Sequence, residues 1–90
     1  MADKLKDKEQ YYQNIMYAVL SMLQLEVRGE VKTGRGRMDL IFELKRRGFI
    51  IEIKINQSAA EAIEQIRQRG YAAVYRGKVD KIYLVGVNID

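Results

Sequence analysis

The stretch GRGRMDLIFELKRRGFIIEIKI, residues 34–55, decides the fold of this chain. Apolar and polar residues alternate through both of its halves, which is typical of strands that bury one face. The segment between the halves, Lys45-Arg46-Arg47-Gly48, is short, polar and ends in glycine, as a hairpin connection should. The stretch therefore predicts two antiparallel strands joined by a tight turn.

The alternation also predicts which side chains share a face of each strand. On the first strand, one face should carry Met38, Leu40, Phe42 and Leu44, and the other Asp39, Ile41, Glu43 and Lys45. On the second strand, one face should carry Phe49, Ile51, Ile53 and Ile55, and the other Ile50, Glu52 and Lys54. Charged residues are rarely placed on half-buried strands without a partner or an ion to satisfy them. Asp39, Glu52 and Lys54 are therefore the candidate functional residues.

The segments that flank the hairpin complete a small fold. Helical spacing of apolar residues predicts a helix over about 7–25, and alternation over 25–31 predicts a strand. After the hairpin, Ser58 and Glu61 form a capping box that opens a helix to about Arg69, and residues 81–87 predict a last strand. Residues 1–8 are charged and are expected to fray. The predicted order is αβββαβ, a single α/β domain over residues 1–90 with a mixed four-stranded sheet flanked by helices.

The composition narrows the chemistry that such a domain could perform. The chain has no cysteine and no histidine, which excludes a thiolate nucleophile, a disulfide and a histidine base or metal ligand. Carboxylates, lysines, tyrosines, serines or a bound hard cation remain, and oxygen ligands favour magnesium or manganese over zinc. No apolar run approaches the ~20 residues that span a membrane, and no signal-peptide stretch is evident. We therefore expect a cytoplasmic protein without membrane contact.

Positive charge is concentrated in the second part of the chain. The formal net charge is +4; residues 1–30 carry four basic and five acidic residues, whereas residues 31–90 carry twelve and seven. A basic face of this kind attracts a polyanion, most commonly nucleic acid. Composition alone is equally compatible with solvated charge that keeps a small protein soluble. The expected phosphate contacts come from Arg35, Arg37, Arg46, Arg47, Arg67 and Arg69.

Asp39, a gap of a dozen residues and then Glu52-x-Lys54 together resemble the motif of the PD-(D/E)xK nucleases. Gly36-Arg37-Met38-Asp39 and residues 58–71 resemble one branch of them, the small nuclease-like domain often found behind an AAA-ATPase-like domain. The resemblance extends from about residue 9 to residue 87, and Met38 stands where the motif has a nominal proline. It implies a restriction-endonuclease-like fold and Mg- or Mn-dependent hydrolysis of phosphodiester bonds, with DNA as the expected substrate.

The resemblance also implies a role for each motif residue. Asp39 and Glu52 would hold the cation, and the main-chain carbonyl of Ile53 could supply another ligand. Lys54 would orient the attacking water or stabilise the developing negative charge. The alternative for Asp39, Glu52 and Lys54 is an ion-pair cluster with no catalysis.

Four other residues are secondary candidates. Related nucleases often carry an acid on the first helix near the metal, which makes Glu9 a candidate ligand; it could equally be a first-turn acid that complements the helix dipole. Glu30 is a second choice as a metal ligand. Gln65 and Tyr71 resemble auxiliary residues of the superfamily. Gln65 could equally be a solvent-facing helix former, and for Tyr71 we prefer a place in the core.

Two other classes of function compete with the nuclease. The same fold could be a catalytically silent module that binds nucleic acid or regulates another domain, or a purely structural interaction domain. Metal-dependent cleavage that is lost on Lys54→Ala would separate the nuclease from the silent module. A structural domain would show neither cleavage nor salt-dependent DNA binding. The sequence leaves open whether the chain forms a homodimer or works with an ATPase domain or another partner chain.

Overall fold

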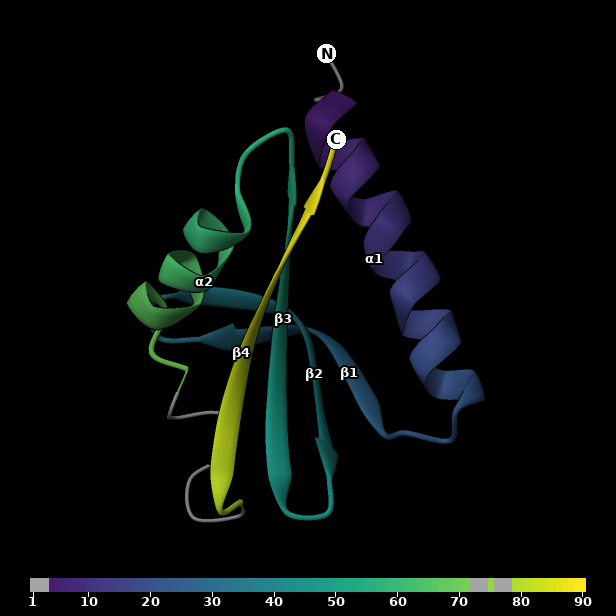
Figure 1. Cartoon of the computed structure of the whole chain (residues 1–90), viewed down its shortest axis with the longest axis vertical. Helices are drawn as coiled ribbons and strands as arrows, with labels where there is room; N and C mark the ends of the chain where they lie inside the picture. The colour runs from purple at the N-terminus through teal and green to yellow at the C-terminus, as the bar shows by residue number, and fades with distance from the viewer. Residues whose placement is uncertain (1–3, 72–74, 76–78) are drawn as a thin grey trace.

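The computed structural model describes residues 4–71, residue 75 and residues 79–90. Its elements are α1 (Lys4–Met22), β1 (Val27–Thr33), β2 (Gly36–Leu44), β3 (Arg47–Ile55), α2 (Ala59–Gln68) and β4 (Lys81–Ile89). They form one sheet in the order β1-β2-β3-β4, in which the first two pairings are antiparallel and the last is parallel (Figure 1). The predicted α/β fold, with its αβββαβ order and mixed four-stranded sheet, is confirmed.

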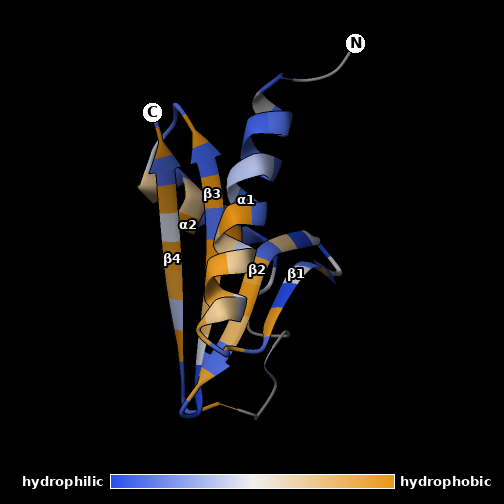
Figure 2. Cartoon of the chain, turned by 90° about the vertical axis from the view of Figure 1, so that its right-hand side faces the viewer, coloured by the Kyte–Doolittle hydropathy of each residue, from blue (hydrophilic) through white to orange (hydrophobic). Residues whose placement is uncertain are grey.

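The two helices cover opposite faces of this sheet (Figures 1 and 2). On the α1 side, residues of the helix such as Met16 pack against a core that includes Leu40, Ile51 and Ile53. On the α2 side, Ile66 packs against Ile41 and Ile50. In β3 the two cores therefore follow the predicted alternation. The capping box that opens α2 is also confirmed, because the Ser58 hydroxyl accepts a hydrogen bond from the Glu61 N–H at 3.0 Å.

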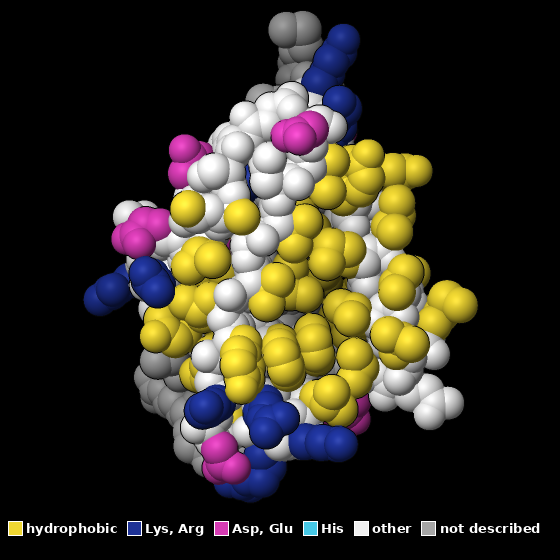
Figure 3. All heavy atoms as spheres, in the orientation of Figure 1, with side chains coloured by type: hydrophobic (Ala, Val, Ile, Leu, Met, Phe, Trp, Pro, Cys, Tyr) yellow, Lys and Arg dark blue, Asp and Glu magenta, His cyan; other side chains and the backbone are white. Residues whose placement is uncertain are grey.

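The α1 side of the sheet is covered only in part. Figure 3 shows apolar side chains gathered over the sheet between the two helices. The rings of Phe42, Phe49 and Tyr83 stack across three strands with centroids 4.7 and 5.1 Å apart. None of the nine residues of β4 is fully buried. Stacked aromatic pairs stabilise neighbouring strands beyond the area that they bury.

The strand β2 departs from the predicted alternation at one position. Met38 was expected to share a face with Leu40 and Phe42, but it packs with Ile41 and Ile66 in the core on the α2 side. The reason is that β2 pairs with β3 only as far as Leu40, while its pairing with β1 continues. Beyond that point β1 and β2 curve toward α2 (Figure 1). The alternation of a strand fixes a face only while the strand stays in one plane.

The hairpin turn is shorter than predicted. Leu44 ends β2 and Arg47 begins β3, so only Lys45 and Arg46 lie between the strands. Both have positive φ angles, 51° and 63°, as the two central residues of a tight type I′ turn require. Gly48 belongs to β3, where a Cβ atom would lie 2.6 Å from the ring of Tyr75. The glycine makes room for that ring and does not form the turn.

Other differences concern the ends of elements. The first helix begins at Lys4, so residues 4–8 are helical where fraying was expected, and it ends at Met22. The first strand spans Val27–Thr33, two residues later than predicted. Between α2 and β4, residues 72–74 and 76–78 lie outside the described part of the chain. Within the described chain, neither helix combines the length and apolar character needed to cross a membrane.

Candidate active site

The separation of β2 from β3 opens a pocket at one end of the sheet. The last pair between these strands is Leu40 with Ile51, and Asp39 and Glu52 are the next residues on the two strands. The pocket has a volume of about 450 Å³. Its lining from the strands and from the end of α2 comprises Arg37, Asp39, Glu52, Lys54 and Arg69, and α1 adds Lys6, Asp7, Glu9, Gln10 and Gln13.

Asp39 is held in place by the backbone of the neighbouring strand. The residue is 9% exposed, and its Oδ2 accepts a hydrogen bond of 3.0 Å from the Ile53 N–H. Because β2 no longer pairs with β3 at this point, the Asp39 carboxyl takes the place of a main-chain acceptor for the Ile53 N–H. Burial raises the pKa of the Asp39 carboxyl, and the hydrogen bond from Ile53 opposes this rise. The carboxyl is thus fixed in position and costly to ionise.

Glu52 is the more deeply buried of the two acids, with 2% of its surface exposed. Its Oε2 accepts a hydrogen bond of 2.9 Å from Nη1 of Arg69. Its Oε1 has no hydrogen-bond partner among the described residues. Burial, and then the charge of Asp39, raise the pKa of the Glu52 carboxyl to about 7. A buried oxygen without a partner, beside a second carboxylate, fits a hard divalent cation, which binds oxygen ligands and removes the repulsion between them.

Lys54 lines the same pocket but does not pair with the acids. Arg69 makes the ion pair with Glu52, at 2.9 Å. Lys54 takes part in no ion pair in the described part of the chain. The side chain of Lys54 is half-buried. An ion-pair cluster of Asp39, Glu52 and Lys54 is therefore not what the structure forms.

The secondary candidates are divided between this pocket and its surroundings. Glu9 lines the pocket, although no third Asp, Glu, His or Cys joins Asp39 and Glu52 in a metal-binding group within the described ranges. Glu30 lines a separate hollow and lies 3.6 Å from Arg37. Gln65 faces a hollow on the α2 side that Lys54 also lines, and its buried Oε1 has no partner among described residues.

A model of the PD-(D/E)XK nuclease superfamily matches residues 7–90. The chain belongs to this superfamily. A protein of Azotobacter chroococcum mcd 1, "Uncharacterized protein in vnfD 5'region", is 33% identical over 81 residues. The match covers 88% of this chain but 16% of that protein, so the chain spans about one sixth of the relative's length. No solved structure matches.

Within this PD-(D/E)xK domain, the predicted phosphate-binding arginines do not form one cluster. Arg37 and Arg69 line the pocket of the two acids. Arg46 and Arg47 lie at the opposite end of β3, where Arg46 pairs with Asp80 at 3.2 Å. Arg67 is exposed on α2, 3.9 Å from Glu64. Arg35 lies in the turn between β1 and β2. Of these six arginines, Arg37 and Arg69 are the two that share a pocket with the acids.

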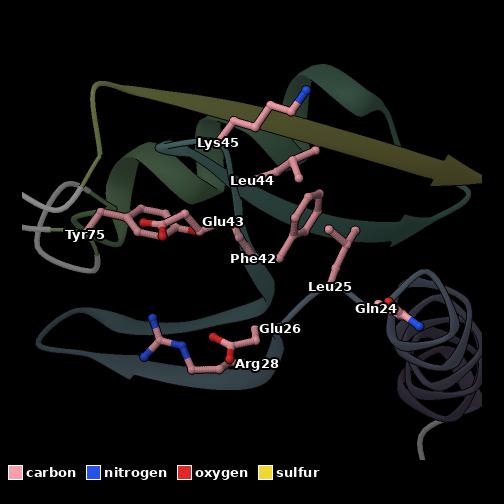
Figure 4. Close-up of a pocket in the computed structure, with 9 residues that line it drawn as sticks. All are labelled: Gln24, Leu25, Glu26, Arg28, Phe42, Glu43, Leu44, Lys45 and Tyr75. Carbon is pink, nitrogen blue, oxygen red and sulfur yellow. The ribbon is translucent and has the colours of Figure 1, made fainter.

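A second pocket of the PD-(D/E)xK domain, also of about 450 Å³, lies at the other end of β2. Figure 4 shows Tyr75 and Glu43 facing Arg28 and Glu26 across it. Both of its acids, Glu26 and Glu43, are exposed, and the Tyr75 hydroxyl is used by the main chain, 2.6 Å from the carbonyl oxygen of Phe42. The two pockets are equal in size, but only the first contains buried carboxylates.

Sequence reasoning missed one residue of the site, Gln13, and the internal contact of another, Arg69. Gln13 is buried and lines the pocket; it lies one helical turn after Glu9, so helical spacing could have identified it. Arg69 was expected to contact phosphate, yet it makes an internal ion pair with Glu52. A buried carboxylate indicates that a positively charged side chain lies nearby. Nothing in the sequence says which of the sixteen Lys and Arg residues is that partner.

The raised pKa of Glu52 predicts how stability depends on pH in metal-free buffer. The ordinary value is 4.5 and the folded value is about 7, so between these pH values the folded state keeps a proton that the unfolded state loses. The free energy of unfolding should fall as pH rises through this window and then level off. The fall that this carboxyl contributes is up to roughly 3 kcal/mol. Urea unfolding with EDTA between pH 4.5 and 8 measures it.

Glu52→Gln is the matched control for this pH dependence. Because glutamine does not titrate, the free energy of unfolding of the variant should not show the fall that Glu52 causes. It should differ most from that of the parent above pH 7. Parallel pH profiles for the parent and the variant would show that Glu52 does not titrate as its environment implies.

Proposed function

We propose that this domain is a metal-dependent nuclease that hydrolyses phosphodiester bonds in DNA. The observation that carries the proposal is the pair of buried carboxylates, Asp39 and Glu52, at the split between β2 and β3, with Oε1 of Glu52 left without a described partner. Membership of the PD-(D/E)xK superfamily supports it, and the order and spacing of Asp39, Glu52 and Lys54 resemble the motif of that superfamily.

Asp39 and Glu52 are the residues that would hold Mg²⁺ or Mn²⁺. A bound cation of this kind supplies polarisation of a phosphate oxygen and acidification of a water molecule. Asp39 presents its carboxyl from a fixed position, because the Ile53 N–H holds one of its oxygens. Glu52 contributes the oxygen that has no other described partner. The main-chain carbonyl of Ile53 is the further ligand that we propose.

Lys54 acts on the reacting phosphate in this proposal. It follows Glu52 by two residues on β3, and both residues line the pocket. An ammonium group there can orient the attacking water or stabilise the negative charge that develops on the phosphate. Because no described carboxylate pairs with it, the ammonium group is available for that task. Gln65, which shares a hollow with Lys54, is a further polar group near the reaction.

If arginines of the pocket contact DNA phosphates, the affinity for DNA should fall as the salt concentration rises. The logarithm of the binding constant should fall linearly with the logarithm of salt concentration, by about 0.9 for each phosphate neutralised. Arg37→Gln should make this slope shallower by about 0.9, the contribution of one phosphate contact, since Arg37 lines the pocket. Fluorescence anisotropy with a labelled duplex, in calcium or EDTA to prevent cleavage, measures the slope.

Arg46→Gln is the control for charge, because Arg46 is paired with Asp80 at the other end of β3. It should leave the slope nearly unchanged. Affinity that does not vary with salt in the parent would contradict nucleic-acid binding. Equal slopes for Arg37→Gln and the parent would place the phosphate elsewhere.

The direct test of the function is a cleavage assay with the purified domain. Supercoiled plasmid, DNA oligonucleotides and RNA oligonucleotides are incubated with Mg²⁺, Mn²⁺ or EDTA. We expect cleavage of DNA with either cation and none in EDTA. Complete inactivity on all substrates, by a folded domain that binds Mn²⁺, would contradict the nuclease.

The second candidate is a catalytically silent module that binds nucleic acid. One observation favours it: the Arg69 guanidinium already satisfies Oε2 of Glu52 at 2.9 Å without any metal. A protein that never binds a cation could use such an arginine to neutralise the two acids permanently. Salt-dependent DNA binding without Mn²⁺ binding would identify this function.

A further inference from the structure

Arg69 occupies the space between the two acids and the start of β2. It follows α2 directly and serves as the residue that caps its end. Its Nη1 lies 2.9 Å from Oε2 of Glu52 and 2.6 Å from the carbonyl oxygen of Arg37. One guanidinium nitrogen thus connects α2, β2 and β3 at the mouth of the site.

The backbone of β2 leaves room for this side chain. Gly36 has a φ angle of +145°, a conformation that other residues rarely adopt. A Cβ atom at this position would lie 3.2 Å from Cγ, Cδ and Nε of Arg69, closer than carbon atoms normally pack. The side chain of Arg69 therefore lies directly over Gly36. Its position is set by the strand as well as by its ion pair.

The ion pair of Arg69 differs from the others in the described chain. Its two side chains are 21% and 3% exposed, whereas the other three pairs join side chains that are 42–68% exposed. Surface pairs contribute little, but a charge that is buried must be neutralised. Arg69 is thus the cation that balances the buried acids when no metal is bound.

Arg69 alone does not neutralise both buried acids. Oε1 of Glu52 lacks a described partner, and the described polar contact of the Asp39 carboxyl is with a main-chain N–H of Ile53. Arg69 makes the one direct ion pair with the two acids among the described residues, while Arg37 and Lys54 act on them from a greater distance. A divalent cation that took both carboxylates would match their charge, but it would then lie next to the positive charge of Arg69. Like charges this close in a partly buried site repel strongly.

We propose that Arg69 is a built-in competitor for the divalent cation: it holds Glu52 in the metal-free domain and leaves it when the cation binds. The inference rests on the proposed metal-dependent function and adds a step to it. The displaced guanidinium remains at the pocket, where it can contact a phosphate of the nucleic acid. Cation binding and substrate binding would then be coupled through one side chain.

The opposite role for Arg69 is to position Glu52 for the metal. The two roles predict changes of opposite sign when the guanidinium is removed. A competitor lowers cation affinity, so its loss should tighten Mn²⁺ binding. A positioning residue orients its ligand, so its loss should weaken Mn²⁺ binding.

Calorimetric titration of Mn²⁺ into the EDTA-treated, dialysed domain distinguishes them. Arg69→Gln should bind Mn²⁺ about tenfold more tightly than the parent, within the usual range of coupling between sites. Arg67→Gln is the matched control: it removes the same charge two residues earlier from an exposed side chain that is 3.9 Å from Glu64. It should change the affinity by less than about twofold, as expected for an exposed pair.

Thermal unfolding gives a second readout. In EDTA, Arg69→Gln should melt at a lower temperature than the parent, because the acids lose their cation. Saturating Mn²⁺ should raise its melting temperature by more than it raises that of the parent. If Arg69→Gln does not fold, Arg69→Lys replaces it. Its ammonium group keeps the charge but lacks the planar fork, so Mn²⁺ binding should be a few-fold tighter than in the parent.

The outcomes separate this inference from the proposed function. A parent domain that binds Mn²⁺, with binding unchanged or weaker in Arg69→Gln, overturns the competitor role and leaves the nuclease standing. If Arg69→Gln is unfolded, Arg69→Lys is compared with the parent. Mn²⁺ binding by Arg69→Lys that is no tighter than in the parent also overturns the competitor role. A parent and variants that bind no Mn²⁺ at all contradict the proposed function itself.

Discussion

Replacing Lys54 with alanine should slow DNA cleavage by about two orders of magnitude or more, as the loss of one group that stabilises a transition state typically does. The fold and the DNA affinity should change little. Lys54 lines the pocket beside Glu52 and belongs to no ion pair in the described residues, so alanine breaks no such pair. Single-turnover cleavage with saturating Mg²⁺, together with thermal unfolding, measures both effects.

The control for Lys54 is another lysine on a strand. Lys81 begins β4 and pairs in the sheet with Arg47, at the end of β3 far from the pocket. Lys81→Ala should cut DNA at nearly the rate of the parent. A stable Lys54→Ala variant that cuts as well as the parent would end the nuclease assignment in this form. A lower melting temperature with unchanged cleavage would instead assign Lys54 a structural role.

Asp39→Asn should have two effects of opposite kind: cleavage falls by at least about a hundredfold, and the metal-free domain becomes more stable. The Asp39 carboxyl is buried, its pKa is raised by that burial, and its charge raises the pKa of Glu52. The ionised pair is thus costly at pH 8. The side-chain oxygen of asparagine can still accept the hydrogen bond from Ile53. We expect a gain of about 1 kcal/mol in the free energy of unfolding.

Urea unfolding in EDTA at pH 8 and cleavage assays in Mg²⁺ measure the two effects on the same preparation. Asp80→Asn is the matched control, because it removes the same charge from an exposed acid that pairs with Arg46. It should leave cleavage unchanged. If Asp39→Asn lowers stability in EDTA, the Asp39 carboxylate stabilises the fold and is not a strained ligand. If it cuts normally, Asp39 does not hold the metal.

Local pattern was sufficient to predict most of the fold. The alternation over residues 34–55 predicted the hairpin, and Ser58 with Glu61 predicted the start of α2; the structure confirms both. The same reasoning identified Asp39 and Glu52, which the structure brings into one pocket with Lys54. The hairpin and the start of α2 were predictable because each depends on residues close together in the chain.

The features that sequence could not predict depend on distant residues. Met38 changes face because β2 leaves β3 and curves toward α2, which the alternation within one strand cannot reveal. Gly48 is placed to admit the ring of Tyr75, which lies 27 positions later. Arg69 reaches Glu52 from the end of α2. Each depends on how separate elements pack, which the local pattern does not encode.

The central claim is that Asp39 and Glu52 together hold a divalent cation. Calorimetric titration of Mn²⁺ into the metal-free domain at pH 8, where Glu52 is ionised, tests it most directly. The parent and Asp80→Asn should each bind Mn²⁺ at this site, and both Asp39→Asn and Glu52→Gln should lose it. Absence of binding by the folded parent, or a site that survives the loss of either carboxylate, would contradict it.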